Sequence, residues 1–236
     1  VPKVLTIAGS DSGGGAGVQA DLKVITALGA YGMSVITAIT AQNTLGVTRI
    51  QDVALDVIEA QIDAVLTDIG ADIVKIGMLA SPEIVRTVAQ SLRKHGIKRI
   101  VLDPVLRATS GASLGGDDTA QALIKGGHLD SKHTQITDYL MWRSVEDNLE
   151  VIQTKEFKHY RVNTLNTHGT GCSLASAIAT YLADGHDLTH AVAKAIAYVE
   201  AGLEAGRFLS IGDGPGPLWH MHDFYPTALL DEKEQR

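Results

Sequence analysis

The residues best suited to chemistry form a glycine-rich turn at 166–173, with the sequence Asn-Thr-His-Gly-Thr-Gly-Cys-Ser. An apolar run that predicts a helix over about 172–183 follows directly. Glycines let successive backbone N–H groups point the same way, and the positive end of the following helix favours an anion. The turn therefore predicts a site for a transferring phosphoryl group. The alternative is a glycine-rich turn that holds a buried, inert cysteine.

Cys172 is a side chain of this turn that can act as a base or as a nucleophile. At the positive end of a helix the pKa of a thiol is expected to fall. The resulting thiolate would either remove a proton from a substrate hydroxyl or attack the substrate as a nucleophile. The residue types alone leave both roles open.

A second glycine cluster occupies 9–17, with the sequence Gly-Ser-Asp-Ser-Gly-Gly-Gly-Ala-Gly. It lies between a predicted strand at 4–9 and a predicted helix at 18–28, where open α/β sheets bind ligands. It is not a P-loop, because no Gly-Lys-Ser/Thr ends it. It also fits the dinucleotide fingerprint poorly, because Val18 stands where the third glycine is required. The cluster alone predicts either a ligand loop or a flexible turn.

Several polar side chains lie at the ends of predicted strands. Gln42 follows the strand at 34–40, Lys75 lies in the strand at 72–78, and Asp103 lies near the end of the strand at 99–105. Lys125 lies near the end of another predicted strand, directly before a Gly-Gly pair. Because parallel strands end at one edge of a sheet, we expect these residues to share that edge.

The histidines do not predict a metal centre. One pair is spaced four residues apart, and another has the pattern His-x-His, but no third ligand stands at a recognisable spacing. We therefore expect core or solvated histidines at His186, His190, His220 and His222.

The elements that must position these residues alternate along the chain. Predicted helices at 18–28, 55–69 and 82–95 separate the strands, and two further helices are predicted near 172–183 and 189–209. Such repeats predict an α/β fold with a mostly parallel central sheet covered by helices on both faces.

Composition excludes several classes of protein. The chain has 236 residues, 45% of them hydrophobic, and a net charge of −7 that is scattered along the sequence. We expect a single domain over 1–236, no nucleic-acid partner and no membrane span, since neither a basic cluster nor a long apolar run is present. The single cysteine and the absence of a signal-peptide pattern predict a cytoplasmic location.

One junction conflicts with this regular alternation. Residues 117–123 predict the opening of a helix, yet they run directly into 124–127, which predict the end of a strand. A change from helix to strand normally needs a cap and a short loop. The sequence therefore predicts that a segment is missing near residues 123–124.

Taken together, the motifs resemble those of the hydroxymethylpyrimidine and phosphomethylpyrimidine kinases of the ribokinase-like superfamily. The resemblance spans nearly the whole chain, in the family's order, at 5–21, 28–32, 41–44, 75–78, 102–105, 125–128, 167–172 and 214–217. It implies a ribokinase-like three-layer α/β/α domain. It also implies phosphorylation of 4-amino-5-hydroxymethyl-2-methylpyrimidine, and then of its monophosphate, for thiamine synthesis. ATP and Mg²⁺ would be required, and a homodimer is the expected assembly.

The resemblance also assigns roles to particular residues. Gln42 would read the amino and nitrogen edge of the pyrimidine, Cys172 would be the catalytic base, and Asp103 is the candidate for a contact to the metal. The full implied set comprises a substrate pocket of Ala8, Asp11, Gly13, Gln42, Met78 and Val105, an anion hole of Gly169, Thr170, Gly171 and Cys172, and ATP contacts from Lys125, Asn166, Thr167 and His168.

The chain departs from the family at the conflicting junction. The family carries there a core strand and an Asn-Leu-Pro-Glu motif whose acidic residue helps to place Mg²⁺ and the phosphates. Either the sequence omits residues that exist, which the intact motifs elsewhere favour, or the chain is shortened. The alternative functions are a pyridoxal kinase and a pyrimidine-binding protein that has lost phosphoryl transfer.

Overall fold

The computed structural model describes residues 1–103, 121–126, 134–146 and 149–225. The chain divides into two compact units. The first combines Val1–Ala112 with Thr164–Arg236, and the second is Ser113–Asn163. The organisation of 1–236 as a single domain stays a prediction, and we describe each unit by itself.

The first unit is built on a five-stranded sheet with the order β3-β2-β1-β4-β5. Its parallel strands are β1 (Lys3–Ser10), β2 (Tyr31–Asn43), β4 (Ile73–Ile76) and β5 (Ile100–Leu102). The edge strand β3 (Gly46–Asp52) runs antiparallel to β2. The interior of β1 and all of β4 are buried, as expected of strands with helices on both faces. The predicted parallel sheet is thus confirmed.

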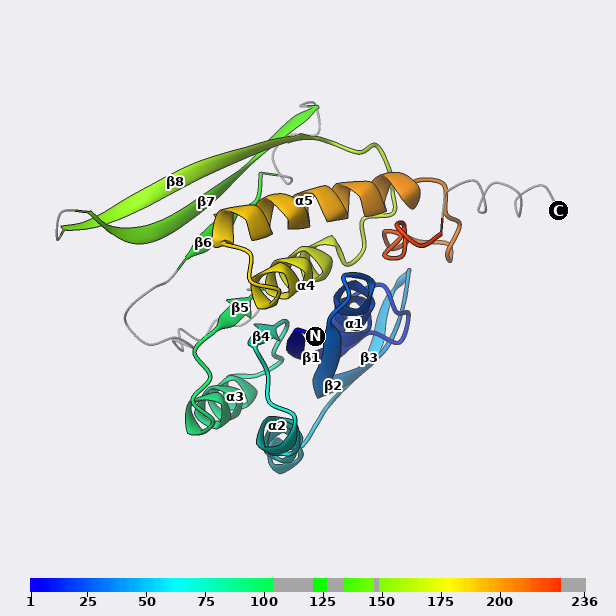
Figure 1. Cartoon of the computed structure of the whole chain (residues 1–236). Helices are drawn as coiled ribbons and strands as arrows, with labels where there is room; N and C mark the ends of the chain where they lie inside the picture. The colour runs from blue at the N-terminus through cyan, green and yellow to red at the C-terminus, as the bar shows by residue number, and fades with distance from the viewer. Residues whose placement is uncertain (104–120, 127–133, 147–148, 226–236) are drawn as a thin grey trace. The chain divides into compact units, whose positions relative to one another are not determined.

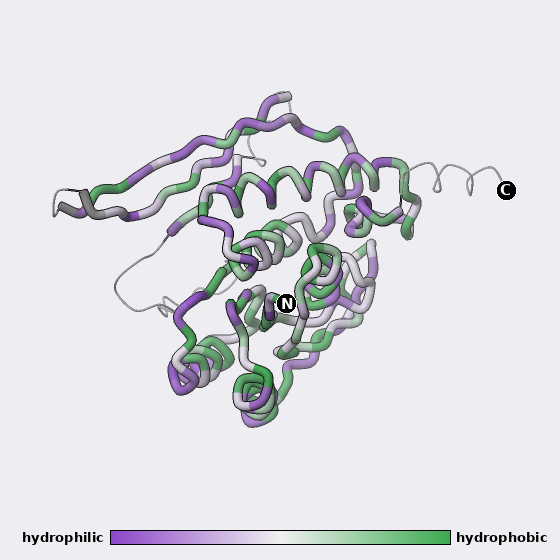
Figure 2. Tube along the Cα trace, viewed as in Figure 1, coloured by the Kyte–Doolittle hydropathy of each residue, from purple (hydrophilic) through white to green (hydrophobic). Residues whose placement is uncertain are grey.

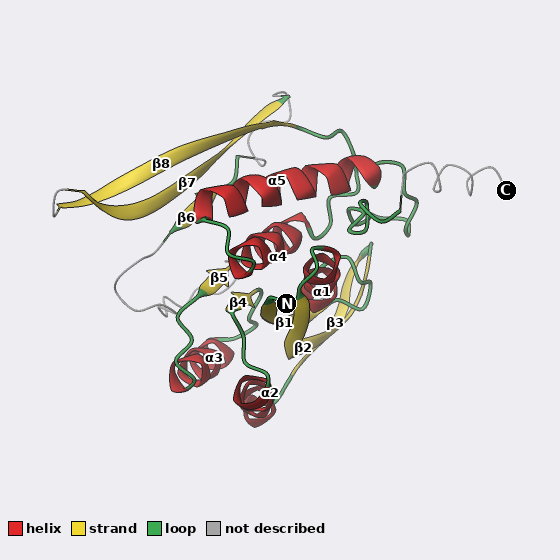
Figure 3. Cartoon of the chain, viewed as in Figure 1, coloured by secondary structure: helices red, strands yellow, loops and turns green. Residues whose placement is uncertain are grey.

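Helices cover both faces of this sheet (Figures 1 and 3). On one face lie α1 (Gly17–Ala27) and α4 (Thr170–Ala183), and α5 (Leu188–Ala205) packs against α4. On the other lie α2 (Leu55–Asp68) and α3 (Pro82–Lys94). The three predicted layers are therefore present within this unit.

The helix α3 shows how local chemistry sets the boundaries. Ser81 Oγ accepts a hydrogen bond from the N–H of Ile84, and Pro82 takes the first helical position. Gly96 ends the helix with a φ of +67°. Both ends were predicted from the sequence. The helix also separates hydrophobic from hydrophilic residues on its two sides (Figure 2).

The second unit is an antiparallel sheet with the order β6-β7-β8. It consists of β6 (Ala122–Ile124), β7 (Gln135–Glu146) and β8 (Leu149–Tyr160). The predicted helix opening at 117–123 is wrong for its last residues, which pair with β7 as a strand. Residues 117–120 lie outside the described residues. No helix among the described residues is long and apolar enough to cross a membrane.

Candidate functional site

The site lies at the carboxyl ends of the parallel strands of the first unit. The strand β1 has β2 on one side and β4 on the other, so the chain changes direction at β1. Ligands bind at such switch points in open α/β sheets. Asp11, Gln42, Met78 and Asp103 all lie at or directly beyond these strand ends. A methyl group placed on Gly9 would lie 3.5 Å from Met78 Cε, so Met78 borders the end of β1.

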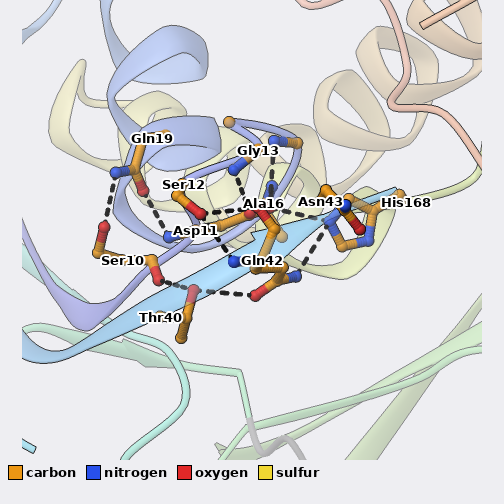
Figure 4. A network of polar contacts seen from close by, with 12 residues as sticks. Ser10, Asp11, Ser12, Gly13, Ala16, Gln19, Thr40, Gln42, Asn43 and His168 are labelled. Carbon is orange, nitrogen blue, oxygen red and sulfur yellow. Dashed lines mark hydrogen bonds and ion pairs between the residues drawn. The ribbon is translucent and has the colours of Figure 1, made fainter. Parts of the chain in front are cut away.

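Asp11 organises the glycine loop between β1 and α1 (Figure 4). Its carboxylate accepts hydrogen bonds from the N–H groups of Gly13 (2.8 Å), Gly15 (3.2 Å) and Ala16 (2.8 Å). A fourth contact, 2.9 Å long, joins Asp11 Oδ2 to His168 Nε2. Asp11 is buried, and its side chain is occupied within the protein. It therefore shapes the substrate loop predicted from the sequence, rather than presenting a free carboxylate to a ligand.

The electrostatics of Asp11 follow from these contacts. Burial on its own would raise the pKa of this carboxyl group. The hydrogen bonds from His168, Ala16 and Gly13 outweigh burial and lower the pKa below its ordinary value. Because the folded protein favours the ionised form, Asp11 stabilises the fold at neutral pH. This contribution is lost as the pH falls below about 3.8, through the pKa of the folded state.

Asp11→Asn is expected to lower the free energy of unfolding at pH 7 by about 1–3 kcal/mol, because the amide replaces one of the two acceptor oxygens that these four donors use with an NH2 donor. Urea denaturation of both proteins at pH 7 and pH 3 measures the effect, and the difference between them should shrink at pH 3. Asp187→Asn is the control, because Asp187 is an exposed cap of α5 that accepts from the N–H of His190. An equal loss in both variants would contradict the role of Asp11.

The two glycine segments found in the sequence meet in the structure. Gly169 has a φ of +79°, and a Cβ on it would overlap the carbonyl group of Gly15. A Cβ on Gly15 would in turn lie 2.5 Å from His168 Cδ2. This close approach requires glycine at both positions. The docking brings the start of α4 against the glycine loop that follows β1.

The start of α4 carries the donors of the predicted anion hole. Gly169 is the N-cap residue, and no side chain among the described residues caps the helix. The first N–H groups of a helix have no partner within it, so those of Gly171 and Cys172 can face an anion. The N–H of Thr170 makes a long hydrogen bond of 3.4 Å to the carbonyl oxygen of Thr167. A Cβ on Gly171 would lie 3.6 Å from Asp103 Oδ2, so the carboxylate predicted as the metal contact borders this turn.

The pKa of Cys172 is raised, which corrects the expectation of a lowered value. Burial is the largest cause, because it disfavours the thiolate. The negative charges of Asp21 and Asp103 act in the same direction. The positive charge of Lys75 and a hydrogen bond from the N–H of Gly17 oppose them without reversing the shift. The helix end alone led to the expectation of a lowered pKa, whereas the buried cysteine that the sequence left open as the alternative agrees better with this raised pKa.

The position of Lys75 in its strand suggested that it faces a ligand. In the structure Lys75 instead points into the interior of the first unit. Its ammonium group is fully buried and contacts both carboxylate oxygens of Asp21 at 2.9 Å. Asp21 also accepts hydrogen bonds from Thr6 (2.6 Å) and Ser176 (2.7 Å). These contacts join β1, α1, β4 and α4. The network therefore holds the start of α4 in register with the sheet, and no sequence motif indicated it.

Asn166 has a structural task in place of the predicted ATP contact. Its side-chain nitrogen donates to the carbonyl oxygens of Gly206 (2.7 Å) and Leu209 (2.8 Å). Its side-chain oxygen accepts from the N–H of Gly216 at 3.1 Å. Both amide protons are used, so none is left for a phosphate. Asn166 is therefore kept out of the phosphate site proposed below, whereas the exposed Thr167 remains in it.

His220 supports α4 from the far end of the chain. It is buried, and its Nε2 lies 3.1 Å from the hydroxyl of Ser173. Burial, aided by the positive charge of Lys23, lowers the pKa of His220 to about 4, so the ring is neutral at pH 7 and can accept the hydroxyl proton. The expectation of a core histidine is confirmed here. Within the described residues, no three His, Cys, Asp or Glu side chains form a metal-binding group.

Three other predicted residues are placed differently from Asp11 and Gln42, or lie outside the first unit as it is described. Ala8 is buried inside β1 with 1% of its surface exposed. Val105 lies outside the described residues. Lys125 belongs to the second unit, directly after β6. By contrast, Gly13 lies over the end of β2, where a Cβ would contact Asn43 and Gln42.

Comparisons with known proteins agree with this geometry. A family described as phosphomethylpyrimidine kinase matches residues 11–124 and 118–219. The chain is 40% identical to the hydroxymethylpyrimidine/phosphomethylpyrimidine kinase of Rhizobium meliloti, over 94% of this chain and 97% of that protein. Identity to the Escherichia coli enzyme of the same name is 35%, over 94% and 98%.

Solved structures show the same fold. The phosphomethylpyrimidine kinase of Clostridium difficile is 35% identical with a TM-score of 0.66, covering 85% of this chain and 98% of that one. The pyridoxal kinase of Staphylococcus aureus, in complex with AMP-PCP and pyridoxal, is 25% identical with a TM-score of 0.77, covering 96% of both chains. The ribokinase-like fold is thus confirmed.

The comparisons also bear on the junction that conflicts in the sequence. The alignment to the Rhizobium meliloti kinase is 270 residues long, yet it covers 94% of a chain of only 236 residues. That relative therefore has residues without a counterpart here. The family match is also divided into two pieces, and both include residues 118–124.

Proposed function

Because this chain belongs to the phosphomethylpyrimidine kinase family, we propose that it transfers the γ-phosphoryl group of ATP to 4-amino-5-hydroxymethyl-2-methylpyrimidine and then to the monophosphate. The product is the pyrophosphate used in thiamine synthesis. One observation carries the proposal: the turn at 169–172 docks on the glycine loop that borders Gln42. A phosphate site and a ring-reading amide therefore share one edge of the sheet.

Catalysis in this arrangement is mainly positioning and charge neutralisation. The N–H groups at the start of α4 hold the γ-phosphoryl group while it moves. Cys172 removes the proton from the attacking hydroxymethyl group, for which its place at the helix start is suited. The raised pKa means that the thiol becomes an effective base only when substrate and cation change its surroundings. From the family resemblance, Thr167 and Lys125 contact the phosphates of ATP.

Mg²⁺ fits the residues of this edge. Magnesium is usually held by one or two carboxylates together with the phosphates of the nucleotide. The carboxylate of Asp103 borders Gly171, so it lies beside the position proposed for the γ-phosphoryl group. When bound, the cation would neutralise charge on the phosphates.

We also propose that a family segment is missing from this sequence at residues 118–124. The split match to the family, its overlap at these residues and the abrupt change from predicted helix to strand support this. If the shortening is real, the chain would bind the pyrimidine with impaired phosphoryl transfer. An intact mass of the protein purified from its natural source separates the two cases.

A pyridoxal kinase is the second candidate, because the Staphylococcus aureus enzyme shares the backbone closely. The residues at the ring-reading edge, Gln42 and Met78, and the higher sequence identity to the pyrimidine kinases favour the pyrimidine. The TM-score compares backbone positions only, whereas the choice of substrate depends on the side chains of the pocket. The high TM-score to the pyridoxal kinase therefore does not identify the substrate.

We expect ATP turnover with the hydroxymethylpyrimidine to exceed that with pyridoxal by at least about tenfold in kcat/KM, because the ring-reading amide pairs with the amino edge. Release of ADP, measured side by side with both substrates under Mg-ATP, tests this. A preference for pyridoxal would contradict the substrate. Calorimetric binding of the pyrimidine without any ADP release would instead identify a binding protein that has lost catalysis.

The assembly and location follow as further parts of the proposal. All seven residues of the edge strand β3 are exposed, and Val47 and Ile50 among them are apolar. Such an edge favours a second copy of the chain as its partner, which gives a homodimer. The single cysteine is in keeping with a reducing cytoplasm.

A further inference from the structure

His168 is held at this edge of the sheet by its contact with Asp11. Its Nε2 lies 2.9 Å from Asp11 Oδ2 and 3.5 Å from the amide nitrogen of Gln42 (Figure 4). An ionised carboxylate accepts hydrogen bonds and cannot donate. His168 must therefore carry its proton on Nε2, in the neutral ring as well as in the charged one.

The protonated Nε2 constrains the side-chain amide of Gln42. With the amide nitrogen toward His168, two donors would face each other. A half-turn of the amide exchanges its nitrogen and oxygen with almost no change of shape. The oxygen then faces the Nε2–H group, which removes the conflict. The single proton of Nε2 is held mainly by Asp11 at 2.9 Å, and Gln42 at 3.5 Å receives the longer branch of this shared hydrogen bond.

The other end of the same amide gives an independent reason for this orientation. The hydroxyl of Thr40 lies 2.8 Å from the carbonyl oxygen of Ser10 and 3.2 Å from the amide of Gln42. A carbonyl oxygen only accepts, so the single proton of Thr40 is given to Ser10. Thr40 can then only accept from Gln42, which places the amide nitrogen toward Thr40 and the oxygen toward His168.

We propose that His168 is the positioning residue that sets the donor and acceptor order of Gln42 and thereby its preference for an aminopyrimidine. A carboxamide has two lone pairs and two N–H groups. One of each is used by His168 and Thr40, so one acceptor and one donor remain for a ligand, in a fixed order. The amino group of the ring would lie on the His168 side and its neighbouring ring nitrogen on the Thr40 side. This inference rests on the function proposed above.

The binding test compares two ligands, the aminopyrimidine substrate and its analogue without the amino group, by calorimetry. His168→Leu should weaken binding of the aminopyrimidine about tenfold and reduce the preference for it over the analogue to a few-fold. His168→Gln should restore the preference, because its amide can donate both to Asp11 and to Gln42. A purely structural role of His168 would weaken both ligands equally, and that result would overturn the inference.

Thr40→Val provides a second test from the other end of the amide, independent of whether His168→Leu folds. The isosteric change removes the acceptor for the nitrogen of Gln42, so the preference for the amino group should again fall. An unchanged preference in Thr40→Val would overturn the inference. So would an affinity for ATP that falls in His168→Leu while binding of the pyrimidine stays unchanged.

A measurement without ligand separates this inference from the proposed function. The ¹⁵N shifts of labelled histidine in the intact chain should show His168 protonated on Nε2 at pH 7 to 8. A bare Nε2 would overturn the inference, whatever the substrate. Failure of the unmodified chain to bind the pyrimidine, with Nε2 protonated, would instead overturn the proposed function.

Discussion

Replacing Cys172 with alanine is expected to lower kcat by about 10²–10⁴-fold, the usual contribution of a general base. The affinity for the pyrimidine should change little, because the proposed task of the thiol is proton removal during transfer. Single-turnover kinetics and calorimetry measure the two quantities separately. Unchanged turnover would remove Cys172 from the mechanism, and the anion hole would then act without a protein base.

The pH dependence of turnover in the unmodified protein is a second test of Cys172 as the catalytic base. In the proposed mechanism the active form is the thiolate, and burial raises the pKa of Cys172 above its ordinary value of 9.0. Between pH 6 and pH 9, kcat/KM, which reports the protein without bound substrate, should therefore rise with pH, because the thiolate fraction increases toward that pKa. Cys172→Asp is the control, since a carboxylate is already ionised at pH 6 and the alkaline rise should disappear.

Gly169→Ala is expected to lower the free energy of unfolding by about 2–5 kcal/mol and to abolish turnover. The left-handed φ of +79° costs a residue with a Cβ about 1–2 kcal/mol. The Cβ would also overlap the carbonyl of Gly15, and such overpacking adds about 1–3 kcal/mol. Relief of that overlap would move the start of α4 away from the glycine loop and so take the anion hole apart. Thermal unfolding and ADP release test both effects.

Gly29→Ala is the control for backbone strain alone. Gly29 has a φ of +81°, almost equal to that of Gly169, and a Cβ there would meet nothing within 4 Å. This variant should lose only the strain of the left-handed backbone and keep its turnover. Equal damage in both variants would show that the docking of Gly169 on Gly15 is not what the site requires.

Local patterns were sufficient for most elements of the first unit. The helix α3 was predicted together with its Ser81 cap and its Gly96 stop, because capping depends on residues a few positions apart. The edge strand β3 and the long hairpin of β7 and β8 were not predicted. Their residues are largely exposed, so no apolar stripe distinguishes them from loops.

The candidate site also contains features that the sequence predicted and features that it did not. Both glycine segments were recognised, because a motif contains its own spacing. Their contact could not be predicted, since Gly15 and Gly169 lie far apart in sequence and meet through the packing of α4 on the sheet. The raised pKa of Cys172 and the neutral His220 also depend on burial, which distant residues supply.

By itself the sequence determined the order of the parallel strands and helices of the first unit, the family motifs, and the two glycine turns with Cys172 between turn and helix. Each of these follows from residue types within one short segment. Only the tertiary structure decided that the carboxylate of Asp11 binds the N–H groups of its own loop and that Lys75 is buried against Asp21. It also decided that His168 and Thr40 both contact the side-chain amide of Gln42. Hydrogen bonds and burial join residues from separate elements, and no local pattern states which donor will meet which acceptor.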